Sequence, residues 1–600
     1  MGPMLDAVVS HPKCHSFFAE VLSLMGSMPA DEQSGLINSE DIETLVTMLD
    51  EYKTHQVMEN ACGAICNIAG QNPELSRCFG AEGGLAMLLG WLEDEELIES
   101  EEVIGAACLT VGLLAADVPQ NERLCHEAGA AAQLLGVMEL LDESMQVQEN
   151  AIFALGTLGK TPAGRAAILD AGGIEAFVLG LEAYQDERDY VEKATRALFF
   201  VGQENPIAKT RMVTAGIPAA LAAIIPKHAS QATVIEGVGG VISMLLEKES
   251  SGPRRARHAL DALVDENIFA LLLDVLGTFS TEVGINRVVL GIFSNFGLLA
   301  GKDAELVRRA GFLDGASAPD GDDAPPLHPA GTGVRRIVDA MRLHSRSMDI
   351  LESGCNAIWC LAKAENRLKA AIRESGAIEL ILKGLASFNH AARYCETACA
   401  ALWCLAFKDP SNKTLIGGLG GMEAVVKALL DHALTAADDT QMVEHGNIAI
   451  ANLVANHRPN RRIAGQAGAV KAVLTPLKEN MEQADWPLTK SHTACNALLA
   501  LLTDEPENQY RFNKAKGRAV IATLAQKYSD KQNVTQLTSM LLEAVPETNE
   551  AIPRPVALTF GAAHSCGGSL GVVVGRGSPV WTRTHGQRTP AGDWTTRETL

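Results

Sequence analysis

The feature that most constrains the fold of this chain is an internal repeat. The segments AIWCLA at 357–362 and ALWCLA at 401–406 are nearly identical and lie 44 residues apart. With the fourth residue of each segment as an anchor, the same register continues at Asn67, Leu113, Thr157, Phe200, Met244, Asn295, Cys360, Cys404, Asn452 and Ala500. Successive anchors are 43 to 51 residues apart, except for one spacing of 65 that contains a Gly/Pro/Asp-rich stretch at 313–333. A period of this length indicates an array of stacked units rather than separate globular domains.

The register around each anchor predicts a helix with one packed face. Two residues before and one residue after the anchors, all twenty positions are apolar, and six residues before them eight of ten are Ala or Gly. At about 100° per residue these positions share one side of a helix. After each such helix comes a glycine and then an apolar run, as in DAGGIEAFVLGL at 170–181. This pattern indicates a sharp turn that leads into a buried helix.

The unit resembles the armadillo repeat, whose long third helix has the form AxWxLxNLA and is followed by a glycine-containing turn. The resemblance implies an all-α, right-handed superhelical solenoid of about eleven repeats, with the third helices lining a concave groove. We expect N-terminal capping helices at 1–50, repeats at 51–312 and 334–502, an inserted loop at 313–333, C-terminal capping helices at 503–545 and a disordered tail at 546–600.

Composition limits the class of function. The chain has 50 Lys and Arg against 73 Asp and Glu, a net charge of −23. Such a surface repels phosphate backbones, which argues against nucleic-acid binding. Thirteen cysteines are too dilute for a disulfide-framed secreted module, and the N-terminus lacks a signal-peptide pattern. The longest uncharged apolar stretch, at 216–226, is too short to cross a bilayer. We expect a monomeric cytoplasmic protein without a membrane span, with the nucleus as a second compartment.

Few motifs in the chain suggest chemistry. Five cysteines lie five residues before an anchor, on the packed side of the helix, where a small apolar side chain fits: Cys62, Cys108, Cys355, Cys399 and Cys495. Short paired zinc-ligand elements are missing, so we expect these thiols to be buried and to bind no metal. PRRARH at 253–258 is interpreted as an exposed loop between helices, with an acidic or phosphorylated partner as the alternative. No catalytic constellation and no cofactor motif can be assembled, so we expect that the protein is not an enzyme.

The candidate binding site is a ladder of glutamates. Eight residues before the anchors lie Glu59, Glu149, Glu192, Glu236, Glu352, Glu396 and Glu444. The same helix face carries Asn67, Asn150, Asn295, Asn356, Asn452 and Asn496. One interpretation is that the carboxylates only complement the helix macrodipole. The other is a peptide-binding groove, in which the carboxylates attract Lys and Arg and the amides bond the backbone of an extended segment.

These features favour a non-enzymatic scaffold that binds extended basic segments of other proteins. The alternative is a nuclear-import adaptor similar to importin-α, whose groove carries Trp four residues before the anchor and Asn at it. None of the ten Trp positions holds Trp here, and Asn fills the anchor only at Asn67, Asn295 and Asn452. The basic N-terminal segment of such adaptors is also missing, because Lys13 is the one Lys or Arg among the first 50 residues. A β-catenin-like hub is disfavoured as well, since the groove of that family is basic.

Overall fold

The structure is a computed structural model of the chain. It describes residues 15–27, 39–52, 54–70, 72–247, 253–301, 303–312, 332–432, 441–480 and 486–545. Over these ranges the chain forms 33 α-helices and no strand. The prediction of an all-α solenoid is confirmed. The tail at 546–600 and most of the inserted loop, 313–331, lie outside the described residues.

After α2 (His15–Ser27), α4 (Ser39–Glu51) and α5 (His55–Ala69) take the second and third places of a repeat, and from α6 (Pro73–Ala81) on the described helices follow one another in triplets. The third helix of each triplet carries the repeat anchor where one was identified. The third helices are α5 (His55–Ala69), α8 (Glu101–Ala115), α11 (Met145–Leu158), α14 (Arg188–Gly202), α17 (Ala232–Leu245), α20 (Val283–Ala300), α23 (Met348–Ala364), α26 (Ala392–Ala406), α29 (Met442–Val454), α32 (Leu488–Leu502) and α35 (Gln532–Ala544). In the described part of the chain, the number of third helices therefore agrees with the expectation of about eleven repeats.

The first and second helices of the triplets are shorter. The first helices are α6 (Pro73–Ala81), α9 (Pro119–Glu127), α12 (Pro162–Asp170), α15 (Pro206–Thr214), α18 (Pro253–Asp265), α21 (Ala304–Arg309), α24 (Leu368–Glu374), α27 (Pro410–Gly418), α30 (Arg458–Gln466) and α33 (Pro506–Lys514). The second helices are α4 (Ser39–Glu51), α7 (Gly84–Trp91), α10 (Ala130–Leu140), α13 (Gly173–Ala183), α16 (Ile217–Lys227), α19 (Ile268–Thr278), α22 (Thr332–Leu343), α25 (Ala377–Ser387), α28 (Gly421–His432), α31 (Ala469–Asn480) and α34 (Gly517–Lys527).

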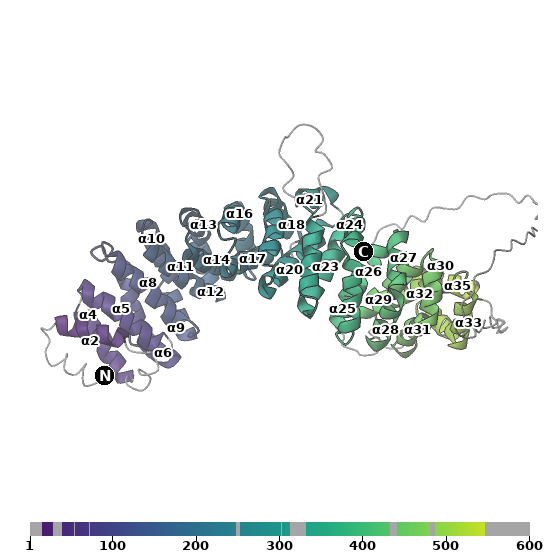
Figure 1. Ribbon diagram of the computed structural model, residues 1–600. Helices are drawn as coiled ribbons and strands as arrows, with labels where there is room; N and C mark the ends of the chain where they lie inside the picture. The colour runs from purple at the N-terminus through teal and green to yellow at the C-terminus, as the bar shows by residue number, and fades with distance from the viewer. Residues whose placement is uncertain are drawn as a thin grey trace, which may run out of the picture. The chain divides into compact units, whose positions relative to one another are not determined.

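The core runs through the stacked third helices. Each third helix contacts the third helix before it and the one after it, and α2 contacts α5 in the same way. Figure 1 shows this succession for α8, α11, α14 and α17, with α10, α13 and α16 beside them. All twenty apolar positions that flank the anchors are buried, and the most accessible, Ile68, is 5% exposed. Burying apolar side chains along the whole stack is the main source of its stability.

The turn between the first and second helices depends on left-handed backbone. Seven glycines there have positive φ: Gly83, Gly129, Gly172, Gly216, Gly376, Gly420 and Gly468. The predicted turn glycine is therefore confirmed, and its reason is the φ value, which other residues adopt only with strain. Asn267 and Lys516 occupy the same position in two repeats, with φ of 56° and 60°.

Buried asparagines join successive repeats. In first helix α30, the Asn460 amide nitrogen donates to the Lys413 carbonyl of the preceding first helix, 2.9 Å away, and to the Leu453 carbonyl, 3.1 Å away. Asn508 repeats this pattern one unit further on. Asn121 does so near the start of the array. Each side chain bonds one carbonyl in the preceding first helix and one in the last turn of a third helix, where the helix ladder supplies no donor, and so links successive repeats.

Buried lysines link the first helix of a repeat to the C-terminal end of its third helix. The Lys413 ammonium donates to the carbonyl of Ala455, which caps the third helix α29, at 2.6 Å. Lys369 reaches the carbonyl of Phe407, the cap of α26, at 2.8 Å in the same way. These carbonyls lie at helix C-termini, where the macrodipole favours positive charge. Burial lowers the pKa of both lysines.

Three sequence predictions need correction. PRRARH is not a loop, because residues 253–258 form the first turns of α18, in which Ala256 and Ala259 are buried. The inserted stretch ends earlier than 333, since α22 begins at Thr332. Residues 503–545 are more than a cap: α33, α34 and α35 form a further triplet, whose third helix packs against α32.

Candidate functional site

The seven ladder glutamates all lie near the N-terminal ends of third helices. Glu59 and Glu236 are exposed, and the other five are half-buried. A carboxylate in the first turns of a helix interacts favourably with the macrodipole, by about 0.3–1 kcal/mol. The macrodipole interpretation therefore accounts for part of the pattern. The structure also gives most of these carboxylates specific partners.

Several ladder glutamates form ion pairs. Lys193 lies 2.7 Å from the Glu149 carboxylate, across the boundary between two repeats. Arg393 lies 3.1 Å from the Glu352 carboxylate in the same manner. Burial raises the pKa of Glu352, and the charge of Arg393 acts in the opposite direction. These glutamates therefore hold adjacent third helices together as well as contributing negative charge to the surface.

Glu192 accepts hydrogen bonds from two side chains, one on its own helix and one in the next repeat. Burial opposes its ionisation, but hydrogen bonds from Thr233 and Arg188 outweigh burial and lower its pKa. The Arg188 guanidinium lies 2.7 Å away on the same helix, whereas Thr233 belongs to the next repeat. Glu192 is therefore ionised at neutral pH and already paired with Arg188 and Thr233.

Glu396 and Glu444, the last two glutamates of the ladder, each accept a hydrogen bond from the following repeat. The backbone N–H of Gln441 donates to Glu396 at 3.1 Å, and the Thr489 hydroxyl donates to Glu444. Gln441 and Thr489 occupy equivalent places, eleven residues before their anchors. The regular spacing of the glutamates thus coincides with a repeated inter-repeat hydrogen bond.

The six predicted asparagines are all half-buried. Asn150 donates to the carbonyl of Gly105 in the neighbouring third helix at 2.9 Å. Asn452 donates within its own helix to Ile448, and the Asn496 amide lies 3.3 Å from the His492 ring nitrogen. Asn67, Asn295 and Asn356 complete the set on the same register. The asparagines therefore share one face with the glutamates, and at least three of them already have hydrogen-bond partners in the chain.

An aromatic cluster on this face was missed by the sequence analysis. Trp359 and Trp403 each stand one residue before an anchor, and both are half-buried. That position lies two helical turns from the ladder glutamate of the same helix, and hence on the same side. The Trp359 ring packs edge to face against His445, two repeats further on, at a centroid distance of 5.5 Å. The signal was visible in AIWCLA and ALWCLA, but only a fold brings Trp359 and His445 together.

Charge and unpaired polar atoms surround the cluster. The Lys363 ammonium lies 5.9 Å from the centre of the Trp359 ring, within the range of a cation–π contact. The indole nitrogens of Trp359 and Trp403 are buried and have no hydrogen-bond partner among the described residues. Nδ1 of His445 is also buried and lies 3.8 Å from the Glu396 carboxylate, too far for a hydrogen bond. Burial lowers the pKa of His445, although Glu444 and Glu396 raise it, so the ring is neutral at pH 7. We call Trp359, Trp403, His445, Glu352 and Glu396 the aromatic–acidic patch.

The five cysteines of the packed position are buried, as predicted. Burial raises the pKa of Cys62, Cys355 and Cys495 to about 12. It also raises the pKa of Cys108 and Cys399. A thiol that stays protonated is a poor nucleophile and a poor metal ligand. Among the described residues no group of three or more His, Cys, Asp or Glu is placed to hold a metal ion.

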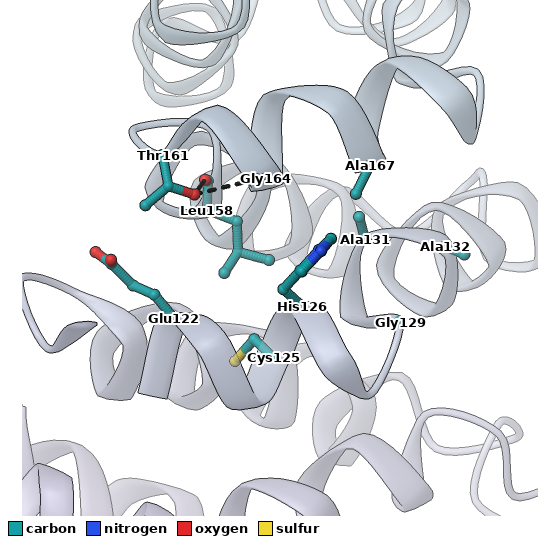
Figure 2. Close-up of a pocket in the computed structure, with 10 residues that line it drawn as sticks. All are labelled: Glu122, Cys125, His126, Gly129, Ala131, Ala132, Leu158, Thr161, Gly164 and Ala167. Atoms are coloured by element: carbon teal, nitrogen blue, oxygen red, sulfur yellow. Dashed lines mark hydrogen bonds between the residues drawn. The ribbon is translucent and has the colours of Figure 1, made fainter. Parts of the chain in front are cut away.

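A small cavity beside α9 contains residue types that often perform chemistry. It measures about 80 Å³ and is lined by Glu122, Cys125, His126 and Thr161. Figure 2 shows His126 reaching toward Ala131 and Ala167, and the Thr161 hydroxyl accepting a hydrogen bond from the Gly164 N–H. Burial raises the pKa of Cys125 to about 12. The cavity therefore offers no activated nucleophile and little room for a substrate.

Among the described residues, the single helix long and apolar enough to cross a membrane, by length and composition alone, is α20. Half of its apolar window is buried inside the protein, and it packs between α17 and α23. Its Phe293 and Phe296 form an aromatic cluster with Phe269 of α19. These contacts are those of a core helix in the stack.

Comparisons with known proteins find similarity in the fold alone. No protein-family model and no curated protein matches the sequence. A structure from work on a phosphorylation switch that controls the interaction between cadherin and β-catenin aligns with a TM-score of 0.66 and 16% identity, covering 91% of this chain and 98% of that one. A crystal structure of an engineered protein from the Northeast Structural Genomics Consortium aligns with a TM-score of 0.59 and 20% identity, covering 75% of this chain and 98% of that one. The chain is therefore similar to these proteins in its tandem helical solenoid.

Proposed function

We propose that this protein is a non-enzymatic scaffold of the armadillo type, which binds an extended basic segment of another protein along its third helices. The aromatic–acidic patch is the observation that carries the proposal. Indole rings and carboxylates on one face recognise Lys and Arg side chains, through cation–π contacts and ion pairs respectively. Lys363, which lies over Trp359, is an example of a cation accommodated there.

The unpaired indole nitrogens of Trp359 and Trp403 support the same function. A buried donor without an acceptor costs about 1–3 kcal/mol. A bound chain supplies backbone carbonyls, and an indole N–H that turns outward finds an acceptor there. Extended segments suit this role because their carbonyls are not used in a helix or sheet.

Binding must be shared among several repeats. One exposed ion pair contributes about 0.2–1 kcal/mol, whereas a micromolar complex requires roughly 8 kcal/mol. The ladder glutamates and asparagines extend the patch in both directions along the array. The similar structure concerns an interaction between β-catenin and cadherin, which agrees with protein binding by a solenoid of this kind.

The test is affinity capture followed by mass spectrometry, with wild type and two triple variants. The first, Glu352→Gln with Glu396→Gln and Glu444→Gln, removes three charges and keeps acceptors for the inter-repeat hydrogen bonds. The matched control changes three exposed carboxylates on the second helices of the same part of the array, namely Glu379→Gln, Glu423→Gln and Glu479→Gln.

We expect partners with basic segments to be lost from the first variant and kept by the control. Synthetic segments of the captured partners should then bind wild type at least tenfold more tightly than the first variant, and added salt should reduce the difference. Trp359→Ala with Trp403→Ala should weaken the same segments. Equal capture by all proteins would mean that the ladder acts only within the solenoid.

A further inference from the structure

A second hollow lies among the second helices of the array. It is a space of about 680 Å³ between second helices α10 and α13. Leu135 and Met138 line it on one side and Leu179 and Tyr184 on the other. It opens because Gly136 and several alanines replace larger side chains between the two helices. Figure 1 shows α10 and α13 next to each other. The volume is that of a ligand-binding cavity.

Leu179 distinguishes this hollow from the rest of the array. Its side chain is 67% exposed. Leu179 lies seven residues after Gly172, the turn residue with positive φ. The position seven residues after the turn residue in the other second helices that follow such a turn holds small or polar residues: Gly90, Gly136, Ala223, Asp274, Lys383, Lys427, Thr475 and Thr523. Leu140, at the end of α10 and next in sequence to the lining residue Glu139, is 64% exposed. Large exposed apolar side chains that gather at one hollow mark an interaction surface.

The chain segments that form the hollow carry acidic and no basic side chains of their own. Residues 127–159 and 166–187, which contain both helices, hold no Lys and no Arg. Arg211 and Lys227 of the next repeat pair with Glu175 and Asp186, and neither basic residue lines the hollow. Glu139 and Asp142 line the rim, and Glu182 is exposed on α13. An occupant with apolar side chains and flanking positive charges complements this surface.

The shape indicates a helix as the occupant. The lining residues run along the length of both eleven-residue helices, which is about 16 Å at 1.5 Å per residue. Because the backbone groups of α10 and α13 are bonded within their helices, they offer an extended peptide no backbone partners. An amphipathic helix satisfies its own backbone and presents apolar side chains at i, i+4 and i+7 over the same length.

We propose that the hollow between α10 and α13 is a docking site for a short amphipathic helix of another protein, with an apolar face flanked by Lys and Arg. The site is separate from the third-helix face, so it does not depend on the function proposed above. The Leu, Met or Phe side chains of the partner fill the hollow beside Leu135 and Met138. Its basic residues face Glu139 and Asp142.

The probe is a fluorescent 18-residue synthetic peptide with Leu on one helix face and Lys beside it, titrated with the full chain. Leu179→Asp adds a charge at the exposed edge of the hollow and should weaken binding at least tenfold. Gly136→Leu adds a side chain that takes up space in the hollow, since a Cβ at Gly136 meets no atom within 4 Å, and should weaken binding to a similar degree. Thr523→Asp, in the same register of α34, is the matched control and should bind as wild type does.

Two altered peptides test the chemistry of the occupant. Replacing Lys with Glu should weaken binding at least tenfold, and a central proline should abolish it. Equal binding by wild type, Leu179→Asp and Gly136→Leu would overturn the site, as would no binding by wild type at 100 µM peptide. A proline peptide that binds as well as the parent would overturn the helical occupant. Circular dichroism of each variant verifies that the fold is intact.

Discussion

The side chain of Asn460 occupies the space that a β-carbon on Gly417 would need. Asn460 Oδ1 lies within contact distance of that position, while its amide nitrogen bonds Lys413 and Leu453. Gly417 thus lets two first helices, α27 and α30, approach closely enough for the asparagine to bond both repeats. Gly465 with Asn508 and Gly80 with Asn121 have the same relationship. Glycine and asparagine together set the spacing of these repeats.

Gly417→Ala should therefore destabilise the protein. The new methyl group displaces Asn460, so the Leu453 carbonyl at the end of α29 loses its donor and the Lys413 carbonyl loses its second donor, at a cost of about 1–3 kcal/mol. Gly418→Ala is the matched control, because its β-carbon would meet no atom within 4 Å. In that helix, Ala should be neutral or stabilising. Urea denaturation of both variants measures the difference, and equal stabilities would show that the asparagine is not needed for stacking.

Lys516→Gly should stabilise the protein. Lys516 has a φ of 60° at a turn where seven repeats use glycine, and its side chain is exposed. Left-handed backbone costs a lysine roughly 1–2 kcal/mol, and the flexibility of glycine in the unfolded chain offsets part of the gain. We expect a net gain of about 0.5–1 kcal/mol in thermal or chemical denaturation. The reverse change, Gly468→Ala, should cost about 1 kcal/mol, and a loss of stability in Lys516→Gly would contradict the argument.

The buried cysteines predict a loss of stability at high pH. The folded pKa of Cys62, Cys355 and Cys495 is about 12, against 9.0 for the free thiol. A folded pKa above the unfolded one means that the stabilisation is complete below pH 9 and is lost as pH rises toward 12. Wild type should therefore lose stability in this range faster than a variant with alanine at all three positions.

At pH 7 each alanine substitution should cost around 1 kcal/mol at most, because it exchanges one small buried side chain for another. The measurement is denaturation of both proteins at pH 7, 9 and 10.5. Parallel pH profiles would show that the thiols do not contribute to the alkaline transition. Bound zinc that disappears with the substitutions would contradict the packing role.

The sequence predicts the repeat well because its evidence is periodic. Ile65 and Leu155 are buried since they recur at one place in a helix, and no long-range information is needed. The charge of PRRARH concealed a helix, although Ala256, Ala259 and Leu260 in and after it have helical spacing and are buried. The prediction of a loop relied on the basic composition of this segment, whereas the helical spacing of its buried residues was the better indicator.

The candidate site was only partly predictable. The register places the glutamates and asparagines on one face, but it does not show that Glu149 already pairs with Lys193 or that Thr489 donates to Glu444. Contact between Trp359 and His445 depends on how far one side chain reaches across two repeats. The hollow beside Leu179 exists because the residues of two helices around it are small, and no pattern within a single helix predicts it.

The final prediction concerns the bond that closes a repeat. Lys413→Met keeps most of the apolar stem but removes the ammonium that donates to Ala455 at 2.6 Å. Two effects oppose each other. The hydrogen bond from a charged donor contributes about 1.5–3 kcal/mol, whereas methionine avoids the desolvation that lowers the pKa of Lys413. Because the carbonyl at the end of α29 loses its donor, we expect a net loss of about 1 kcal/mol.

Lys427→Met, on an exposed site of α28 in the same repeat, is the control and should stay within about 0.5 kcal/mol of wild type. Hydrogen exchange locates the effect: because each repeat contacts mainly its neighbours, amides near the end of α29 should exchange faster in Lys413→Met, while those of α8 and α11 should not change. Faster exchange throughout the array would mean that the repeats unfold as one unit. Unchanged exchange and stability would mean that desolvation of the buried ammonium cancels the hydrogen bond.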